Sequence, residues 1–481
     1  MDFFSLFWDP AFFQLLADET NLYARQKIEL KPDKKWYSTT ADEMRAFIGV
    51  NIIMGIDKKP TIYQYWSTDP FLGNPGIQST FSRDRFEALC RYLHLHDSQQ
   101  MPEREDPSYD PLYKVRPLID LCQHTFRNPL EPGQDLSIDE GMIRYKGRLY
   151  FRQYMPKKPV KWGIKVWMLG ESKSGYVCTF GIYLGKSEEA EGAQGTRVVL
   201  HLSEPFHSTN RHLYFDNFFM SVHLTEELLR KGTYCCGTLR ANRYPDVYKT
   251  KRGGRRQGIK LKKGEMRQLQ KGSMLITLWH DKRQIALLST NCSPNEQVTV
   301  QRRTKKPPHH QNISIPAPVH LYNQHMGGVD LSDQMRSYYH AGRSCKKCWR
   351  FILWFLLDVS ISNAFIIERL SPHATAPRSR RTHLQFHIEL AKQLIGGFCG
   401  RKRKVTRCKS TPVDNALSLP NLPGHREVKF FGRKGACMQC SSHGRKTPSG
   451  RTPETIFDCD RCGVSLCGSG CFLQYHTEKG H

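Results

Sequence analysis

Three short acidic segments carry the residue types that a metal-dependent phosphoryl-transfer site requires. They are SIDEGMIRYKGR with Asp139, YFDNFF with Asp216, and GGVDLSDQM with Asp330 and Asp333. Each places carboxylates within apolar or glycine-rich sequence, whereas most of the 45 acidic residues lie in polar surroundings. Mg2+ prefers oxygen ligands, and a two-metal site needs several carboxylates from separate elements at one point. The four aspartates are therefore candidate metal ligands, although an N-cap or turn role is the commoner explanation for any single one.

A second group of possible ligands lies near the carboxyl end. Seven soft ligands stand there at zinc-like spacings, in a segment too small to build a conventional core: Cys437, Cys440, Cys459, Cys462, Cys467, Cys471 and His476. Eight ligands would hold two tetrahedral Zn2+ ions with interleaved pairs, as in a cross-brace, and the eighth is His481 or His443. Cys345 and Cys348 have no second pair and are better interpreted as core or surface residues.

The elements that position the acidic segments form a mixed set of helices and strands. Residues 1 to about 130 alternate apolar and charged positions at helical spacing, and Ser82 is placed as an N-cap. From 134 to about 240, runs such as WGIKVWML and GYVCTFGIYL indicate strands. HLYFDNFF is interpreted as a buried strand that ends at Asp216, and the two aspartates of DLSD share one helix face. The pattern predicts an α/β core with its acids at strand ends.

A long interruption separates the second acidic segment from the third. It contains the basic run KTKRGGRRQGIKLKKGEMRQ, the strand-like runs SMLITLW and QIALLST, and the loop RRTKKPPHH, which together indicate an inserted subdomain. Beyond Asp333, WRFILWFLLDVSISNAFIIERL lacks a polar face and predicts a buried helix. LQFHIELAKQLIGG predicts a further helix that ends at paired glycines.

Composition favours nucleic acid as the partner. The chain has 72 Lys and Arg against 45 Asp and Glu, a formal net charge of +27, which favours a polyanion through counterion release. The longest apolar stretch, FILWFLL, is broken by Asp358 and is far shorter than the roughly 20 residues of a membrane-spanning helix. The amino terminus lacks a basic leader, so we expect an intracellular protein whose 16 cysteines stay reduced.

The order of the motifs along the chain resembles that of the piggyBac-type transposases. The matching strings are SRDRFEALCRYLHLHD, DPLYKVRPLID, LSIDEGMIRYKGR, PKKPVKWGIKVW, LYFDNFF, GTLRANR, LLST, YNQHMGGVDLSDQM, FLLDVSISNAF and the terminal cysteine-rich module. One string could arise by chance, but ten in the same order with similar intervals could hardly do so. The resemblance runs essentially from end to end.

The resemblance implies an RNase H-like catalytic core with an inserted subdomain, flanked by helical segments and followed by a small cross-brace zinc module. The implied domains are a helical dimerisation and DNA-binding region at 1–134, the first part of the catalytic core at 135–242, an insertion domain at 243–316, the second part of the core at 317–339, a second helical dimerisation and DNA-binding part at 340–400, a basic linker at 401–435 and a cysteine-rich zinc-binding domain at 436–481.

The resemblance also implies roles for the acidic residues. Asp139, Asp216 and Asp330 would bind two Mg2+ ions, while Asp333 would orient Asp330 or an ion-bound water. The implied reaction is cut-and-paste transposition by a nuclear homodimer at TTAA targets, with the zinc module gripping terminal inverted repeats of double-stranded DNA. The basic segments KTKRGGRRQGIKLKK and RKRK are expected to contact phosphates, and RKRK is equally well interpreted as a nuclear import signal.

Two other functions remain open at this point. One is a domesticated descendant that binds DNA or chromatin without moving it. The other is a zinc-dependent interaction protein such as a ubiquitin ligase. The presence of all four acids favours a transposase over the first, and the +27 charge is unexplained by the second.

Overall fold

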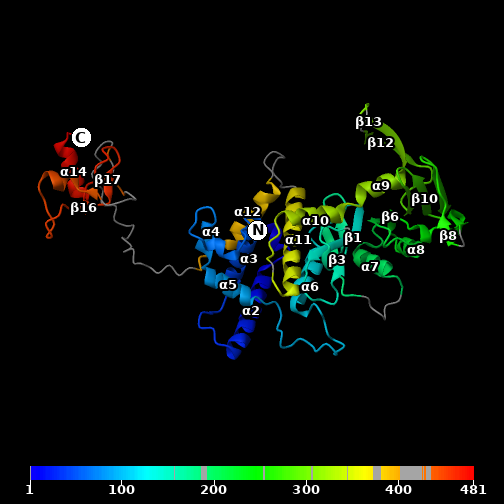
Figure 1. Cartoon of the computed structure of the whole chain (residues 1–481), viewed down its shortest axis with the longest axis horizontal. Coiled ribbons are helices and arrows are strands. Elements are labelled where there is room, and N and C mark those ends of the chain that lie inside the picture. Colours follow the sequence, from blue (N-terminus) through cyan, green and yellow to red (C-terminus); the bar gives the residue numbers. More distant parts are fainter. Residues whose placement is uncertain are drawn as a thin grey trace. The chain divides into compact units, whose positions relative to one another are not determined.

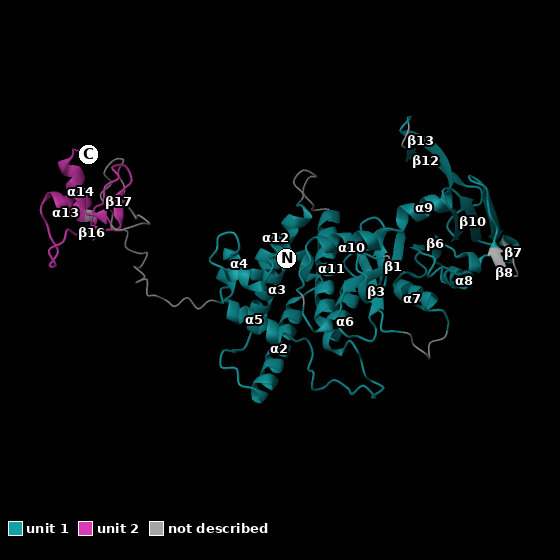
Figure 2. Cartoon of the chain, in the orientation of Figure 1, with its two compact units in different colours: residues 1–401 teal, residues 402–481 magenta. Residues whose placement is uncertain are grey.

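The computed structural model describes residues 2–156, 158–185, 192–252, 255–304, 307–343, 345–371, 381–400, 425, 427–429 and 435–480. The chain divides into two compact units, residues 1–401 and 402–481 (Figure 2). The first unit holds all three acidic segments, and the second holds the terminal cysteines.

The first unit begins with a block of helices, four of which are capped by side chains at their amino ends. The helices are α1 (Asp2–Ser5), α2 (Pro10–Leu30), α3 (Ala41–Ile56), α4 (Pro75–Thr80), α5 (Arg83–Tyr92) and α6 (Arg116–Thr125). Asp9, Thr40 and Asn74 cap α2, α3 and α4 by accepting a backbone N–H of the first turn. The predicted cap at Ser82 is confirmed, since its side chain accepts the N–H of Arg85 at 3.3 Å.

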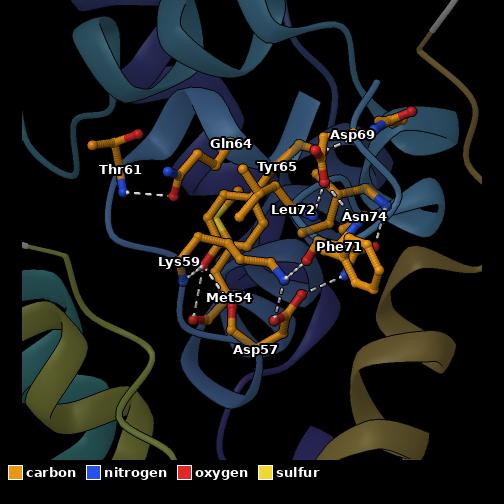
Figure 3. Close-up of polar contacts among 12 residues, drawn as sticks. Met54, Asp57, Lys59, Thr61, Gln64, Tyr65, Asp69, Phe71, Leu72 and Asn74 are labelled. Carbon is orange, nitrogen blue, oxygen red and sulfur yellow. Dashed lines mark hydrogen bonds and ion pairs between the residues drawn. The ribbon is translucent and has the colours of Figure 1, made fainter. Parts of the chain in front are cut away.

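The connection between α3 and α4 folds around the fully buried side chain of Tyr65, which lies in the short helix η1 (Ile62–Trp66) (Figure 3). The Tyr65 hydroxyl donates to the carbonyl of Asp57 at 2.6 Å and accepts the N–H of Lys59 at 3.2 Å. The Asp57 carboxylate in turn contacts Lys59 Nζ at 3.0 Å and Asn74 Nδ2 at 3.0 Å. This network fixes the end of α3 relative to the start of α4.

The strands that follow form one nine-stranded sheet within the described residues. Its members are β1 (Asp135–Arg144), β2 (Gln153–Tyr154), β3 (Trp162–Glu171), β4 (Val177–Ile182), β5 (His212–Phe215), β6 (Tyr234–Thr238), β9 (Met266–Lys271), β10 (Met274–His280) and β11 (Gln284–Ser289). The order is β2-β3-β1-β5-β6-β11-β10-β9, with β4 on β3. β5 is parallel to both β1 and β6, and the other pairs are antiparallel.

Two helices accompany the parallel strands. They are α7 (Gln194–Ser203), before β5, and α8 (Val222–Arg230), which connects β5 to β6. Ser221 caps α8 by accepting the N–H of Leu224 at 3.1 Å, and Leu224 and Leu228 are fully buried. The predicted mixed α/β arrangement is therefore confirmed.

The long interruption joins this sheet instead of standing apart from it. The predicted strands SMLITLW and QIALLST are β10 and β11, and β11 pairs with β6 through Leu288 and Gly237. The remaining strands form two hairpins, β7 (Lys249–Arg252) with β8 (Arg255–Gly258), and β12 (Gln297–Arg303) with β13 (His310–Pro316). The interruption thus extends the core sheet on the side of β6.

Four helices complete the first unit: α9 (Ala317–His325), α10 (Gly328–Tyr338), α11 (Cys348–Leu370) and α12 (His383–Ile395). Figure 1 shows α11 between the first helical block and the sheet, in contact with α1, α6 and β1. By length and composition α11 could cross a membrane, but 89% of its apolar window is buried, as in the core helix of a globular protein. The predicted helix end at paired glycines is confirmed, because Gly396 ends α12 in the left-handed conformation.

The second unit contains short elements around the cysteines. They are β14 (Glu427–Lys429), β15 (Gly435–Ala436), α13 (Met438–Ser442), β16 (Glu454–Thr455), β17 (Phe457–Cys459) and α14 (Ser469–Glu478). β14 pairs with β17, and β15 pairs with β16. Its few apolar residues, Leu466 and Phe472 among them, pack with the cysteines, so the ligands themselves form the centre of this unit.

Candidate active site and metal-binding module

Asp139 and Asp216 lie at neighbouring positions on two parallel strands. Ile138 of β1 is paired with Phe215 of β5, so the next residue on each strand is an aspartate. Ile138 and Phe215 are fully buried and hold this part of the sheet in the core. The expectation of acids at strand ends is met by Asp216, which directly follows β5, and is wrong for Asp139, which lies in the middle of β1. Because the two strands run parallel, both aspartates still directly follow the last pair of the ladder that β1 and β5 share.

The third acidic segment reaches the same strand through α10. A Cβ placed on Gly141 of β1 would lie 3.4 Å from Asp333 Oδ1, which puts that carboxylate directly over the strand. A Cβ on Gly328 would lie 2.5 Å from Ser137 Oγ and 2.9 Å from the carbonyl oxygen of Glu171. Glycine at 328 therefore allows the first turn of α10 to approach β1 and β3 closely.

Asp330 and Asp333 are one turn apart on α10, so both face the strand side on which Asp139 and Gly141 lie. Arg336, a further turn along, donates to Asp333 Oδ1 at 2.9 Å. The structure thus brings the four sequence-predicted aspartates to one region, from three separate elements.

Burial and mutual repulsion shape the electrostatics of this region. Burial raises the pKa of Asp216, and the negative charge of Asp139 raises it further, against the N–H of Phe218, which Asp216 Oδ1 accepts at 2.7 Å. Burial likewise raises the pKa of Asp330, again with a contribution from Asp139. Burial and Asp139 together raise the pKa of Glu140 to about 7. Excess negative charge of this kind is what a divalent cation would relieve.

The carboxylate set fits hard divalent cations. Its donors are all oxygens, and one oxygen each of Asp139 and Asp216 is occupied by a backbone N–H, from Glu140 at 2.8 Å and from Phe218 at 2.7 Å. No three of the four aspartates bring one oxygen each to within 4.8 Å of the others.

The terminal cysteines form two separate sets of four possible ligands. In each set the four ligand atoms lie within 4.8 Å of one another. The first set is Cys437, Cys440, Cys467 and Cys471. Cys440 Sγ lies 3.4 Å from Cys467 Sγ, and the N–H of Cys467 donates to Cys437 Sγ at 3.2 Å. Burial opposes thiolate formation at Cys437, but the backbone N–H groups of Cys440 and Cys467 bring its pKa down to about 7.

The second set includes a histidine that the sequence analysis did not consider. It consists of His425, Cys459, Cys462 and His476. His425 Nδ1 lies 3.5 Å from Cys459 Sγ and 3.4 Å from Cys462 Sγ. His443 instead pairs with Glu478 at 3.3 Å, and His481 lies outside the described residues.

The donor chemistry of both sets suits tetrahedral zinc: four sulfurs in one, two sulfurs and two imidazole nitrogens in the other. His476 Nδ1 is hydrogen-bonded to the carbonyl of Phe472 at 2.7 Å, which directs Nε2 toward Cys462 Sγ at 3.6 Å. The sets alternate along the chain, since the pair Cys459 and Cys462 lies between the two pairs of the first set. The predicted cross-brace arrangement is therefore present.

Sequence reasoning missed two residues that the structure places at these centres. His425 stands 12 residues before Cys437, outside the zinc-like spacings, and only its position in PGHRE offers a signal. Lys158 lies in PKKPVKWG, part of a string that contributes to the family resemblance but for which the sequence analysis predicts no role in the site. Its Nζ is 3.4 Å from Asp139 Oδ2.

Comparison with known proteins shows which family this chain resembles. A family model described as Transposase IS4 matches residues 1–365. Human PiggyBac transposable element-derived protein 3 is 27% identical over 98% of this chain and 75% of its own length. Human PiggyBac transposable element-derived protein 5 is 25% identical over 82% of this chain and 75% of its own length.

The same likeness extends to three dimensions. A solved structure, the cryo-EM structure of the piggyBac transposase synaptic complex with hairpin DNA, matches with a TM-score of 0.69 and 26% sequence identity. The match covers 97% of this chain and 94% of that chain. Since the family model spans most of the catalytic unit and the structural match spans nearly the whole chain, the chain belongs to the Transposase IS4 family of DDE transposases, in its piggyBac group.

Proposed function

We propose that this chain catalyses cut-and-paste transposition, in which it cleaves DNA at the terminal inverted repeats of its own element and joins the ends to TTAA targets. The observation that carries the proposal is the meeting of Asp139 and Asp216 on paired parallel strands, with Asp333 over the same strand. A domain that binds DNA without cutting it has no need of this convergence.

Each carboxylate has a distinct part in the proposed reaction. When bound, two Mg2+ ions would supply Lewis acidity for in-line attack on a phosphodiester by water or a 3′-hydroxyl. Asp139 stands on β1, which pairs with β5 and contacts α10, and together with Asp216 and Asp330 it would hold the two ions. Asp333 is paired with Arg336 and would act by orienting its neighbour on α10.

In the proposed reaction, different domains would recognise the DNA and catalyse its cleavage. We assign 135–242 and 317–339 to the catalytic core, 243–316 to the insertion, 1–134 and 340–400 to helical DNA-binding and dimerisation parts, and 436–481 to a zinc module that reads the repeats. The linker at 401–435, with RKRK, lies almost wholly outside the described residues. The protein would act in the nucleus as a homodimer.

The decisive test compares the parent protein with Asp139→Asn on duplex DNA that carries the repeats flanking its own gene. With Mg2+, the Asn variant should cut at least about 10³-fold more slowly, because it loses the shared charged ligand, while its DNA affinity stays within about twofold. Asp135→Asn is the matched control: Asp135 lies on the same strand and accepts the hydroxyl of Tyr214 at 3.0 Å, a role that an amide oxygen can keep.

Two outcomes would contradict the proposal. Equal cleavage by Asp139→Asn and the parent would rule out this carboxylate site. The two human relatives are named as transposable element-derived proteins. A parent protein that binds the repeats but leaves them uncut with both Mg2+ and Mn2+ would instead support a domesticated DNA-binding function.

A further inference from the structure

Lys158 lies at the acid cluster although it belongs to none of its elements. It stands in the loop between β2 and β3, which is closed by a hydrogen bond from the N–H of Met155 to the carbonyl of Lys161 at 2.8 Å. The loop folds back over β1, where Lys158 Nζ donates to the carbonyl of Glu140 at 2.9 Å and lies 3.4 Å from Asp139 Oδ2. The side chains of Lys158 and Asp139 are only 21% and 16% exposed. The partly buried ammonium of Lys158 therefore contacts Oδ2 of Asp139, whereas the other oxygen, Oδ1, accepts the N–H of Glu140.

The other basic side chains near the cluster have additional fixed partners. Arg336 pairs with Asp333 and lies 4.6 Å from the centre of the Phe355 ring. Lys165 Nζ lies 4.2 Å from the centre of the Trp167 ring. Lys158 is held by one ion pair and one carbonyl, so its flexible four-carbon stem can change partners at little cost.

We propose that Lys158 is a catalytic residue with two successive partners: the Asp139 carboxylate in the metal-free protein, and a non-bridging oxygen of the scissile phosphate once metal is bound. The inference rests on the proposed function, since the phosphate must approach Asp139 to react. Divalent cations at Asp139 repel a neighbouring ammonium, and a phosphodiester that arrives there offers a new anion. Negative charge on the non-bridging oxygens has to be balanced during the displacement, and a positioned ammonium does so.

The first arm of the test measures metal binding without DNA. Mn2+ is titrated into the full-length parent, Lys158→Ala, Lys158→Arg and Lys161→Ala, and free Mn2+ is followed by electron paramagnetic resonance. Lys158→Ala should bind Mn2+ about fivefold more tightly, because the competing cation is gone. Lys158→Arg keeps the charge, and Lys161 is an exposed lysine of the same loop, so both variants should stay within about twofold of the parent.

The second arm measures cleavage of the flanking-repeat duplex at saturating Mg2+. Lys158→Ala should be about 10²-fold slower, with DNA affinity within about twofold, while Lys158→Arg recovers most of the rate and Lys161→Ala equals the parent. Tighter metal binding with slower chemistry is a combination that a merely structural lysine would not give. Lys158→Gln replaces the Ala variant should the latter unfold.

The inference is overturned if Lys158→Ala binds Mn2+ no more tightly than the parent, or if it cleaves at the parental rate at saturating Mg2+. If the parent leaves repeat DNA uncut, the proposed function has failed and the phosphate contact fails with it. The Mn2+ affinities still decide in that case whether Lys158 competes for the metal site.

Discussion

Single residues fix the two candidate metal centres by the same means, a backbone N–H aimed at a ligand atom. The N–H groups of Glu140 and Phe218 each hold one carboxylate oxygen in the acid cluster. The N–H of Cys462 similarly points at Cys459 Sγ at 3.5 Å, and that of Cys467 points at Cys437 Sγ. Each ligand is thereby oriented before any ion arrives, which lowers the cost of ordering the site.

His425 provides a residue-scale prediction for the zinc module. The full-length parent should hold close to two equivalents of zinc after dialysis, and His425→Ala close to one, because the all-cysteine set remains complete. Elemental analysis of the purified proteins measures this directly. His443→Ala is the matched control and should keep two equivalents; loss of zinc from that variant instead would show that the second set is assembled differently.

At the scale of elements, two features position the acidic residues. One helix lies close to the sheet, and the sheet itself is continuous. Gly328 lets α10 lie against β1 and β3, and α11 packs behind β1. Beyond β6, the strands β11, β10 and β9, which lie in the chain between the second and third acidic segments, extend the same sheet. The acids therefore stand on a frame that is supported from both sides.

The connection between α3 and α4 carries a stability prediction. Tyr65→Phe removes a buried hydroxyl and leaves the carbonyl of Asp57 and the N–H of Lys59 without this partner (Figure 3). The free energy of unfolding should fall by about 1–2 kcal/mol.

Urea unfolding followed by tryptophan fluorescence reports on the first unit, since all 8 tryptophans lie within residues 1–401. Tyr63→Phe is the control because Tyr63 is 60% exposed. An unchanged midpoint for Tyr65→Phe would mean that the hydroxyl network adds nothing to stability.

Local patterns were sufficient to predict several elements of the first unit. The Ser82 cap, the buried strand before Asp216 and the apolar helix at 348–370 all follow from spacing and burial within one segment. The order of the motifs along the chain was sufficient to predict the family. The pairing of β11 with β6 could not be predicted, because a strand pattern does not say which edge it joins.

The two missed residues share a physical reason. His425 reaches Cys459 and Cys462 across 34 and 37 positions, and Lys158 reaches Asp139 across 19, in both cases from segments without regular periodicity. Ligands within one short segment show a spacing, whereas a ligand brought in by a loop shows none. The assignment of the four aspartates to metal binding stays a prediction until it is measured.

At the scale of the whole molecule, the chain separates a large unit with the acid cluster from a small unit with the cysteines. The +27 net charge gives the chain a general affinity for phosphates, which does not by itself distinguish sequences. Base-specific contacts therefore have to come from a defined surface, and we place them in the terminal module.

Deleting 436–481 tests this division. The truncated protein should lose its preference for repeat DNA but keep weak, steeply salt-dependent binding, because its remaining basic surface still neutralises phosphates. Binding of repeat and scrambled duplexes at matched salt measures both effects.

Replacing the lysines and arginines of 251–263 with glutamine is the complementary variant, which should flatten the salt dependence and weaken both duplexes about equally. Residues 253 and 254 of this segment lie outside the described residues. Discrimination that survives in the truncated protein would assign sequence recognition to the large unit.

Alternation of the two ligand sets makes the terminal module complete only late in synthesis. One set opens with Cys437 and closes with Cys471, and the other opens with His425 and closes with His476. A ribosome delivers these residues in order, so the first set is complete only after Cys471 and the second only after His476, long after the first unit has emerged and can fold. A nonsense codon before 471 would leave both sets incomplete and every residue of the acid cluster in place, and under the proposed function such a product should keep DNA cleavage but lose its preference for the repeats.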